Sequence, residues 1–117
     1  MDLNQAVQAH AEWKLKFRSA ITRHEQMDVV TISRDDCCNL GKWLHGEAKA
    51  KYSKLDSFAQ CVDRHAHFHK EAARIAEAIN AKKYDAASTM LDAGTAYTAA
   101  SNAVGAAIIH LKREANL

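Results

Sequence analysis

Hydrophobic residues recur every three or four positions along most of this chain, which is the spacing of an amphipathic helix. In the first segment the series includes Trp13, Phe17 and Ile21, and His10 falls on the same face. The pattern predicts a helix over about residues 3–27, with His10 on its inward side.

The next stretch, VVTISRDD, contains β-branched residues and shows no helical period. Asp35 or Asp36 is a suitable N-cap for a short second helix through CCNLGKWLHG, because a carboxylate accepts hydrogen bonds from the free amides of a first turn. Gly46 is its predicted end, and a lysine-rich connection follows.

The second half of the chain predicts two further helices. Asp56 or Ser57 is the predicted cap of a third helix, whose apolar series is Phe58, Cys61 or Val62, His65, Phe68, Ala72, Ile75 or Ala76, and Ile79. The last segment, about residues 83–115, keeps the helical period and is rich in small residues, and Gly94 or Gly105 can mark a bend. We therefore expect one all-α domain over residues 1–117, an antiparallel four-helix bundle of three long helices and one shorter helix.

Composition supports this class and narrows the function. The 117 residues include no proline and only four glycines, which favours helices over a turn-rich β fold. Sixteen Lys and Arg are interleaved with fourteen Asp and Glu, so no basic surface for nucleic acid is indicated.

The start MDLNQAVQAH does not resemble a signal peptide, and no apolar run is long enough for membrane insertion, so we expect a cytoplasmic protein. Three cysteines, Cys37, Cys38 and Cys61, cannot all pair, which favours a reducing compartment.

Three histidines are concentrated in the sequence HAHFHK, residues 65–70. A strand would place all three on one face, whereas a helix aligns His65 with His69 and turns His67 away. Because the helical period continues on both sides, we expect His65 and His69 to lie one turn apart beside the buried face, with His67 facing solvent.

Four polar side chains are thus predicted on inward faces: His10, Cys38, His65 and His69. A buried histidine without a partner is costly, and a shared metal ion explains all of them together. Zinc is the natural metal, since it takes imidazole nitrogen and thiolate sulfur in a tetrahedral arrangement and His-x-x-x-His provides two ligands from one helix. Cys37 competes with Cys38, because neighbours on a helix differ by about 100° and only one can face the site.

The same residues form a longer pattern. The sequence contains His10-x-x-Trp13, then Cys38-x-Leu40-Gly41-x-Trp43, then His65-x-x-x-His69. In order and spacing these three elements resemble the chemoreceptor zinc-binding (CZB) domain family, with no departure at these positions. The pattern spans residues 10–69 and selects Cys38 over Cys37.

The resemblance implies a cytoplasmic, bacterial zinc-binding regulatory domain with a helical fold and a tendency to form homodimers. It implies that His10, Cys38, His65 and His69 are the zinc ligands and that Trp13, Leu40, Gly41 and Trp43 support them by packing. Members of the family are joined to chemotaxis receptors or diguanylate cyclases, and respond to zinc availability or to oxidants such as hypochlorous acid through the zinc-bound cysteine. The small-residue last helix is a candidate dimer seam.

The remaining histidines, thiols and tryptophans have simpler explanations. His24 and His45 lie near predicted helix ends, where a cation interacts favourably with the helix dipole. His110 is expected on the surface, and Cys61 is expected to be a small core residue. Trp13 and Trp43 are expected to pack in the core.

Two other classes of function remain as alternatives. One is a metal-free helical interaction module whose histidines only pack. The other is a di-iron or haem protein, which helical bundles also form, although no Glu-x-x-His motif lies near the inward histidines. An enzyme is disfavoured, because a zinc site closed by four protein ligands leaves no position for substrate.

Overall fold

The computed structural model describes all residues, Met1–Leu117, and the helices are joined by turns and irregular segments, without strands. The chain forms eight helical segments, namely α1 (Leu3–Ala11), α2 (Trp13–Arg23), α3 (Val29–Ser33), α4 (Asn39–His45), α5 (Glu47–Tyr52), α6 (Asp56–Asn80), α7 (Tyr84–Met90) and α8 (Ala96–Glu114). The predicted all-α class is confirmed. The predicted number of helices is wrong, because the first and last expected helices are each divided in two, and two stretches expected to be connections form α3 and α5.

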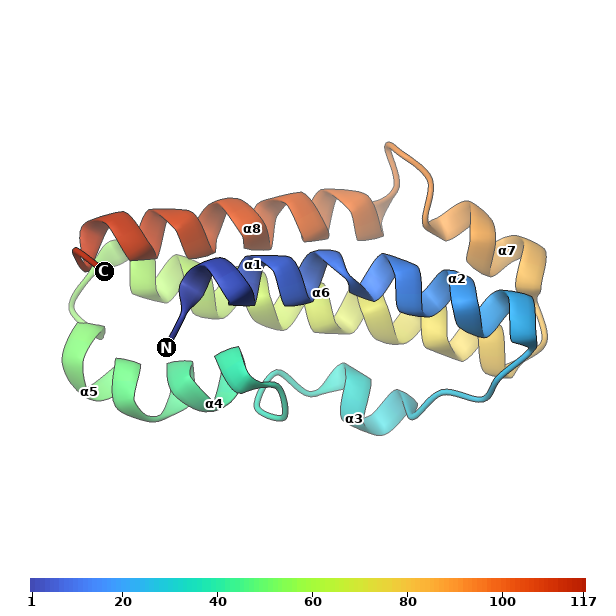
Figure 1. Ribbon diagram of the computed structural model, residues 1–117, viewed down its shortest axis with the longest axis horizontal. Coiled ribbons are helices and arrows are strands. Elements are labelled where there is room, and N and C mark those ends of the chain that lie inside the picture. The colour runs from blue at the N-terminus through green and yellow to red at the C-terminus, as the bar shows by residue number, and fades with distance from the viewer.

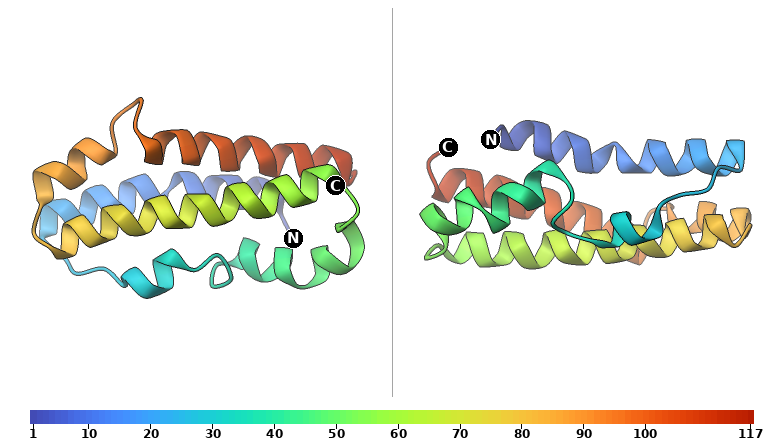
Figure 2. Two further views of the ribbon diagram at one scale, coloured as in Figure 1. Left: turned by 180° about the vertical axis from the view of Figure 1, so that it is seen from behind. Right: turned by 90° about the horizontal axis from the view of Figure 1, so that it is seen from below.

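The segments lie in rows along an elongated molecule of 43 × 25 × 19 Å. Figure 1 shows α1 and α2 forming one row, α7 and α8 a second, and α3, α4 and α5 a third. The long helix α6 packs against α2, α3, α4, α7 and α8. Figure 2 shows the same rows from behind and from below, with α3 and α4 on one side of α6. Residues from the first and third rows therefore meet over α6.

The first row ends earlier than the hydrophobic period predicts. His24 is the C-cap of α2 with φ 54° and ψ 41°, a left-handed conformation that cannot continue the helix. Beyond it, the side chain of Asn80 accepts a hydrogen bond from the Met27 amide at 2.8 Å and donates one to the Met27 carbonyl at 2.8 Å. A residue 53 positions away thus fixes the backbone that leaves this helix.

The middle of the chain is more helical than its sequence pattern indicates. The stretch predicted to be irregular contains α3, because Asp28 accepts a hydrogen bond from the Thr31 amide at 3.2 Å and caps the turn. The predicted caps Asp35 and Asp36 are wrong: Cys38 is the N-cap of α4. Gly46 does end α4, as expected, but the lysine-rich connection after it forms α5.

Helix α6 has the predicted inward face but a different start. Its buried residues include the expected series Phe58, Cys61, His65, Phe68, Ala72, Ile75, Ala76 and Ile79. Neither Asp56 nor Ser57 is the cap, since Leu55 occupies that position without a side-chain hydrogen bond. The hydroxyl of Ser57 instead donates to the Glu114 carboxylate of α8 at 2.8 Å. A tertiary contact has therefore replaced the predicted local cap.

The last predicted helix is divided at the first of its two glycines. Gly94 has φ 81°, a left-handed value that favours glycine, and lies in the turn between α7 and α8. The hydroxyl of Thr95 then accepts a hydrogen bond from the Thr98 amide and caps α8. Helix α8 continues through Gly105, where no end or positive φ occurs.

A single hydrophobic core runs through the rows, with Phe17, Leu44, Phe68, Leu91 and Ile108 fully buried. None of the helices has both the length and the apolar character that crossing a membrane requires.

Candidate metal centre

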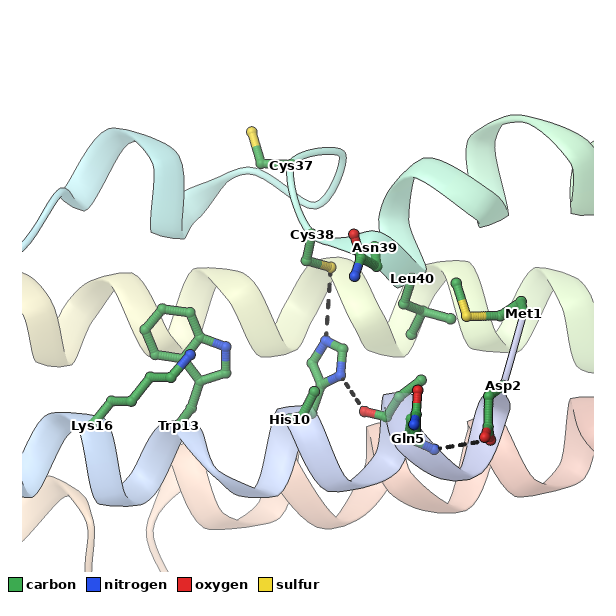
Figure 3. A pocket seen from close by; sticks show the side chains of 12 residues that line it. Met1, Asp2, Gln5, His10, Trp13, Lys16, Cys37, Cys38, Asn39 and Leu40 are labelled. Atoms are coloured by element: carbon green, nitrogen blue, oxygen red, sulfur yellow. Dashed lines mark hydrogen bonds between the residues drawn. The ribbon is translucent and has the colours of Figure 1, made fainter.

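His10 lies at the end of α1 with its side chain turned into the molecule, where it is only 4% exposed. Its Nδ1 is 2.7 Å from the carbonyl oxygen of Ala6, one turn earlier. A carbonyl only accepts hydrogen bonds, so this contact places the proton on Nδ1 and leaves the Nε2 lone pair free. In Figure 3 that Nε2 points at the sulfur of Cys38.

His65 and His69 lie one turn apart on the buried face of α6, as predicted, with 0% and 3% of their surfaces exposed. Their Nε2 atoms are 3.0 Å apart. His69 Nδ1 is 2.9 Å from the carbonyl oxygen of Ile32 in α3, which fixes the ring as the Ala6 carbonyl fixes that of His10. His65 Nδ1 is buried without a hydrogen-bond partner.

Cys38 reaches the histidines from the turn before α4. As the N-cap it has an extended backbone, and its Sγ accepts a hydrogen bond from the Gly41 amide at 3.3 Å. Gly41 is needed here for space: a Cβ at this position would lie 1.8 Å from the carbonyl oxygen of Asp35. The absence of a side chain lets the turn fold tightly over α4, and this turn directs the thiol inward.

The Asp35 side chain makes a further contact between the same turn and α4. Its carboxylate lies 2.9 Å from Nε2 of His45, near the end of α4. Asp36 is held separately by two hydrogen bonds from Arg34, each of 3.0 Å. The two acids predicted as caps thus hold the segment before Cys38 through side-chain contacts with His45 and Arg34.

The four predicted ligands meet at one point. Cys38 Sγ lies 3.9 Å from Nε2 of His10, 3.2 Å from that of His65 and 3.6 Å from that of His69. All four ligand atoms lie within 4.8 Å of one another. In a tetrahedral zinc site the corresponding separations are about 3.6 Å for sulfur to nitrogen and about 3.3 Å between nitrogens. The separations from Cys38 Sγ to the three nitrogens are therefore close to those that a zinc ion requires.

The protonation states also fit a metal ion. Burial lowers the pKa of His10 and His69 and lowers that of His65 to about 2, so all three imidazoles are neutral near pH 7. Burial raises the pKa of the Cys38 thiol, while the amides of Gly41 and Leu40 act in the opposite direction. Without a cation, the Nε2 lone pairs of His10 and His69 would face the same small space beside a thiol. A bound cation would stabilise both the lone pairs and the thiolate.

The other histidines and thiols lie away from this point. His67 and His110 are exposed, and Cys61 is a fully buried core residue, as predicted. His24 is at a helix end, also as predicted, and stacks on Tyr84 with ring centroids 4.0 Å apart. Cys37 points away from the site in Figure 3, unlike its neighbour.

The two tryptophans are half-buried and pack against the edge of the core. Trp13 contacts Phe17, with ring centroids 5.5 Å apart, and Trp43 contacts Tyr52 at 6.1 Å. The core prediction is thus only partly met, and Trp13 also lines an open cleft beside the ligands.

Sequence reasoning missed the groups that orient the ligands. The Ala6 and Ile32 carbonyls are backbone atoms, and no residue type marks them. Asp35 and His45 were identifiable residues, but their pairing depends on the turn between them.

A family model, the chemoreceptor zinc-binding domain, matches residues 10–76, which is more than half of the chain. The chain belongs to this family. No curated protein and no solved structure matches it. The matched region of this CZB domain contains all four clustered side chains, and the metal that the family binds is zinc.

Proposed function

We propose that this CZB domain is a sensory and regulatory module that binds one zinc ion through His10, Cys38, His65 and His69. The observation that supports it is the convergence of one sulfur and three neutral imidazole nitrogens within 4.8 Å. Two of the imidazoles are oriented by backbone carbonyls, as is usual for zinc-bound histidine. The third, His65, lacks such a partner, and its Nε2 lies 3.2 Å from Cys38 Sγ and 3.0 Å from Nε2 of His69.

Four protein ligands close a zinc coordination shell, which suits a regulatory site better than a catalytic one. The ligands come from three separate elements, α1, the turn before α4, and α6. Depletion of zinc would remove the ion that joins the three elements, and oxidation of Cys38 would remove one of its ligands. Either change would release one element from the others. We propose that this change in helix packing is the signal.

We further propose a single cytoplasmic domain whose rows of helices are an interrupted antiparallel four-helix bundle. It would act as a homodimer and control a linked chemoreceptor signalling domain or diguanylate cyclase domain. The outer side of α8 is the candidate dimer seam, because it presents small residues and Ile109, which is 41% exposed. Sedimentation of a monomer at tens of micromolar, a range typical of weak association, would contradict the dimer.

Elemental analysis of purified protein tests the zinc site directly. We expect about one zinc per chain in the wild type and in Cys37→Ala, and marked loss in Cys38→Ala. Cys37 is a matched control, because it is the adjacent thiol and points away from the histidines. Absence of zinc after reconstitution under reducing conditions would favour the metal-free interaction module instead.

Differential scanning calorimetry of metal-free and zinc-loaded protein gives a second test. Zinc that bridges three elements of the fold must raise the melting temperature, because it binds only the folded arrangement. An unchanged melting curve on zinc addition would refute the site.

A further inference from the structure

A cleft of about 400 Å³ opens beside the four clustered ligands, between α1 and the turn before α4. Figure 3 shows that Cys38 and His10 form part of its wall. The volume is in the range that holds small molecules. Any molecule bound in this cleft is therefore adjacent to the ligand side chains.

Exposure of the four ligands is uneven. Cys38 is half-buried, whereas His10, His65 and His69 are at most 4% exposed. Cys38 is thus the most solvent-exposed of the four ligand residues, and it lies in a turn and not inside a helix. A competing chelator would meet Cys38 first.

The charges around the cleft favour an anion. Lys16 lies at its wall with the ammonium 4.5 Å from the centre of the Trp13 ring, a cation–π contact that holds it beside the opening. Asp2 is the one acidic residue of the lining, and its carboxylate already accepts the Gln5 amide at the start of α1. Zinc bound by three neutral imidazoles and one thiolate adds a further net positive charge.

We propose that this cleft binds small anionic zinc chelators and is the route by which they remove the metal. This inference rests on the proposed function. The chelator first occupies the cleft beside Lys16, and its carboxylate or thiolate donor then replaces Cys38 as a ligand. Cys38 takes up a proton as its sulfur leaves, and a chelator that enters as a thiol releases one, so no redox partner is needed.

Chelators of different charge, used on cobalt-loaded protein, test the proposal. Cobalt takes the place of zinc, and loss of its sulfur charge-transfer absorbance reports departure of the Cys38 sulfur. We expect the removal rate to saturate with nitrilotriacetate, because binding in the cleft precedes exchange. Lys16→Gln should raise the half-saturating concentration about fivefold, the effect of one nearby charge in water. Removal by neutral 1,10-phenanthroline should not change.

Two matched controls separate the cleft from general effects. Lys14→Gln removes the same charge from the same helix but lies outside the cleft lining. Ala9→Phe fills the cleft from an exposed position, whereas Ala11→Phe adds the same ring at an exposed position outside it. Lys14→Gln and Ala11→Phe should behave as the wild type, and Ala9→Phe should slow removal by both chelators.

A rate independent of chelator concentration would overturn the proposal. The proposal would also be wrong if Lys16→Gln and Lys14→Gln changed the half-saturating concentration equally. It would be wrong as well if Ala9→Phe and Ala11→Phe changed the removal rate equally. Metal content distinguishes this failure from that of the zinc site itself. A protein that binds one cobalt or zinc but shows none of these differences lacks only the cleft function, whereas one that binds neither refutes both.

Discussion

Replacing Gly41 by alanine tests whether a close backbone approach positions Cys38. The added Cβ would lie 1.8 Å from the carbonyl oxygen of Asp35, and the two nearest atoms both belong to the backbone. Cβ contacts below about 3.0 Å are not tolerated, so the turn and α4 must separate by roughly 1 Å or more. That movement lengthens the Gly41 amide to Cys38 Sγ hydrogen bond, which is 3.3 Å in the native fold.

The loss of stability expected for Gly41→Ala follows from the kind of atoms that collide. Overpacking that flexible side chains can absorb costs about 1–3 kcal/mol, and a backbone collision should reach the upper end of that range. For a domain of this size, about 3 kcal/mol lowers the melting temperature by roughly 10 °C or more. Zinc affinity should fall as well, because the sulfur is displaced from the three nitrogens.

Gly105→Ala is the matched control for this prediction. Nothing lies within 4 Å of a Cβ added at Gly105, which is inside α8. Removing glycine from a helix interior should stabilise the protein by about 0.5–1 kcal/mol. Thermal melts of both variants, with and without zinc, and zinc competition against a chromophoric chelator measure the effects. If Gly41→Ala matched the wild type in melting and zinc affinity, the reasoning would be wrong.

Three further predictions concern the buried site and core. The Tyr97 hydroxyl is buried without a hydrogen-bond partner, so Tyr97→Phe should leave urea stability unchanged or raise it by about 1 kcal/mol, and a loss above 1 kcal/mol would indicate an unseen partner. Burial lowers the pKa of His65 to about 2, so the unfolded state binds more protons below about pH 6.5 and metal-free stability must fall with acidification. By pH 5 the loss from His65 is about 2 kcal/mol in urea titrations. His65→Gln should remove this share of the pH dependence, while the smaller shares from His10 and His69 remain. Asp35→Asn weakens the 2.9 Å contact with His45, which is partly exposed, so zinc affinity should fall at most about fivefold; a loss of a hundredfold would mean that Asp35 acts on the ligands directly.

Sequence alone determined the helical class, the inward face of α6 and the four candidate ligands. These features depend on short-range periodicity: the 3.6-residue turn makes His65 and His69 neighbours wherever that helix lies. The family pattern also selected Cys38 over Cys37, which local geometry could not do. The structure directs Cys38 toward the histidines and Cys37 away from them.

Only the tertiary structure decided where helices end and how the ligands are held. Asn80 fixes the backbone after α2, and Glu114 takes the Ser57 hydroxyl that was predicted to cap α6. The Ile32 carbonyl orients His69 from 37 residues away, through a backbone atom that no residue type marks. Such contacts join residues far apart in sequence, so their energies depend on packing and not on local pattern. For the same reason the cleft beside Cys38 exists only once α1 and the turn before α4 have come together.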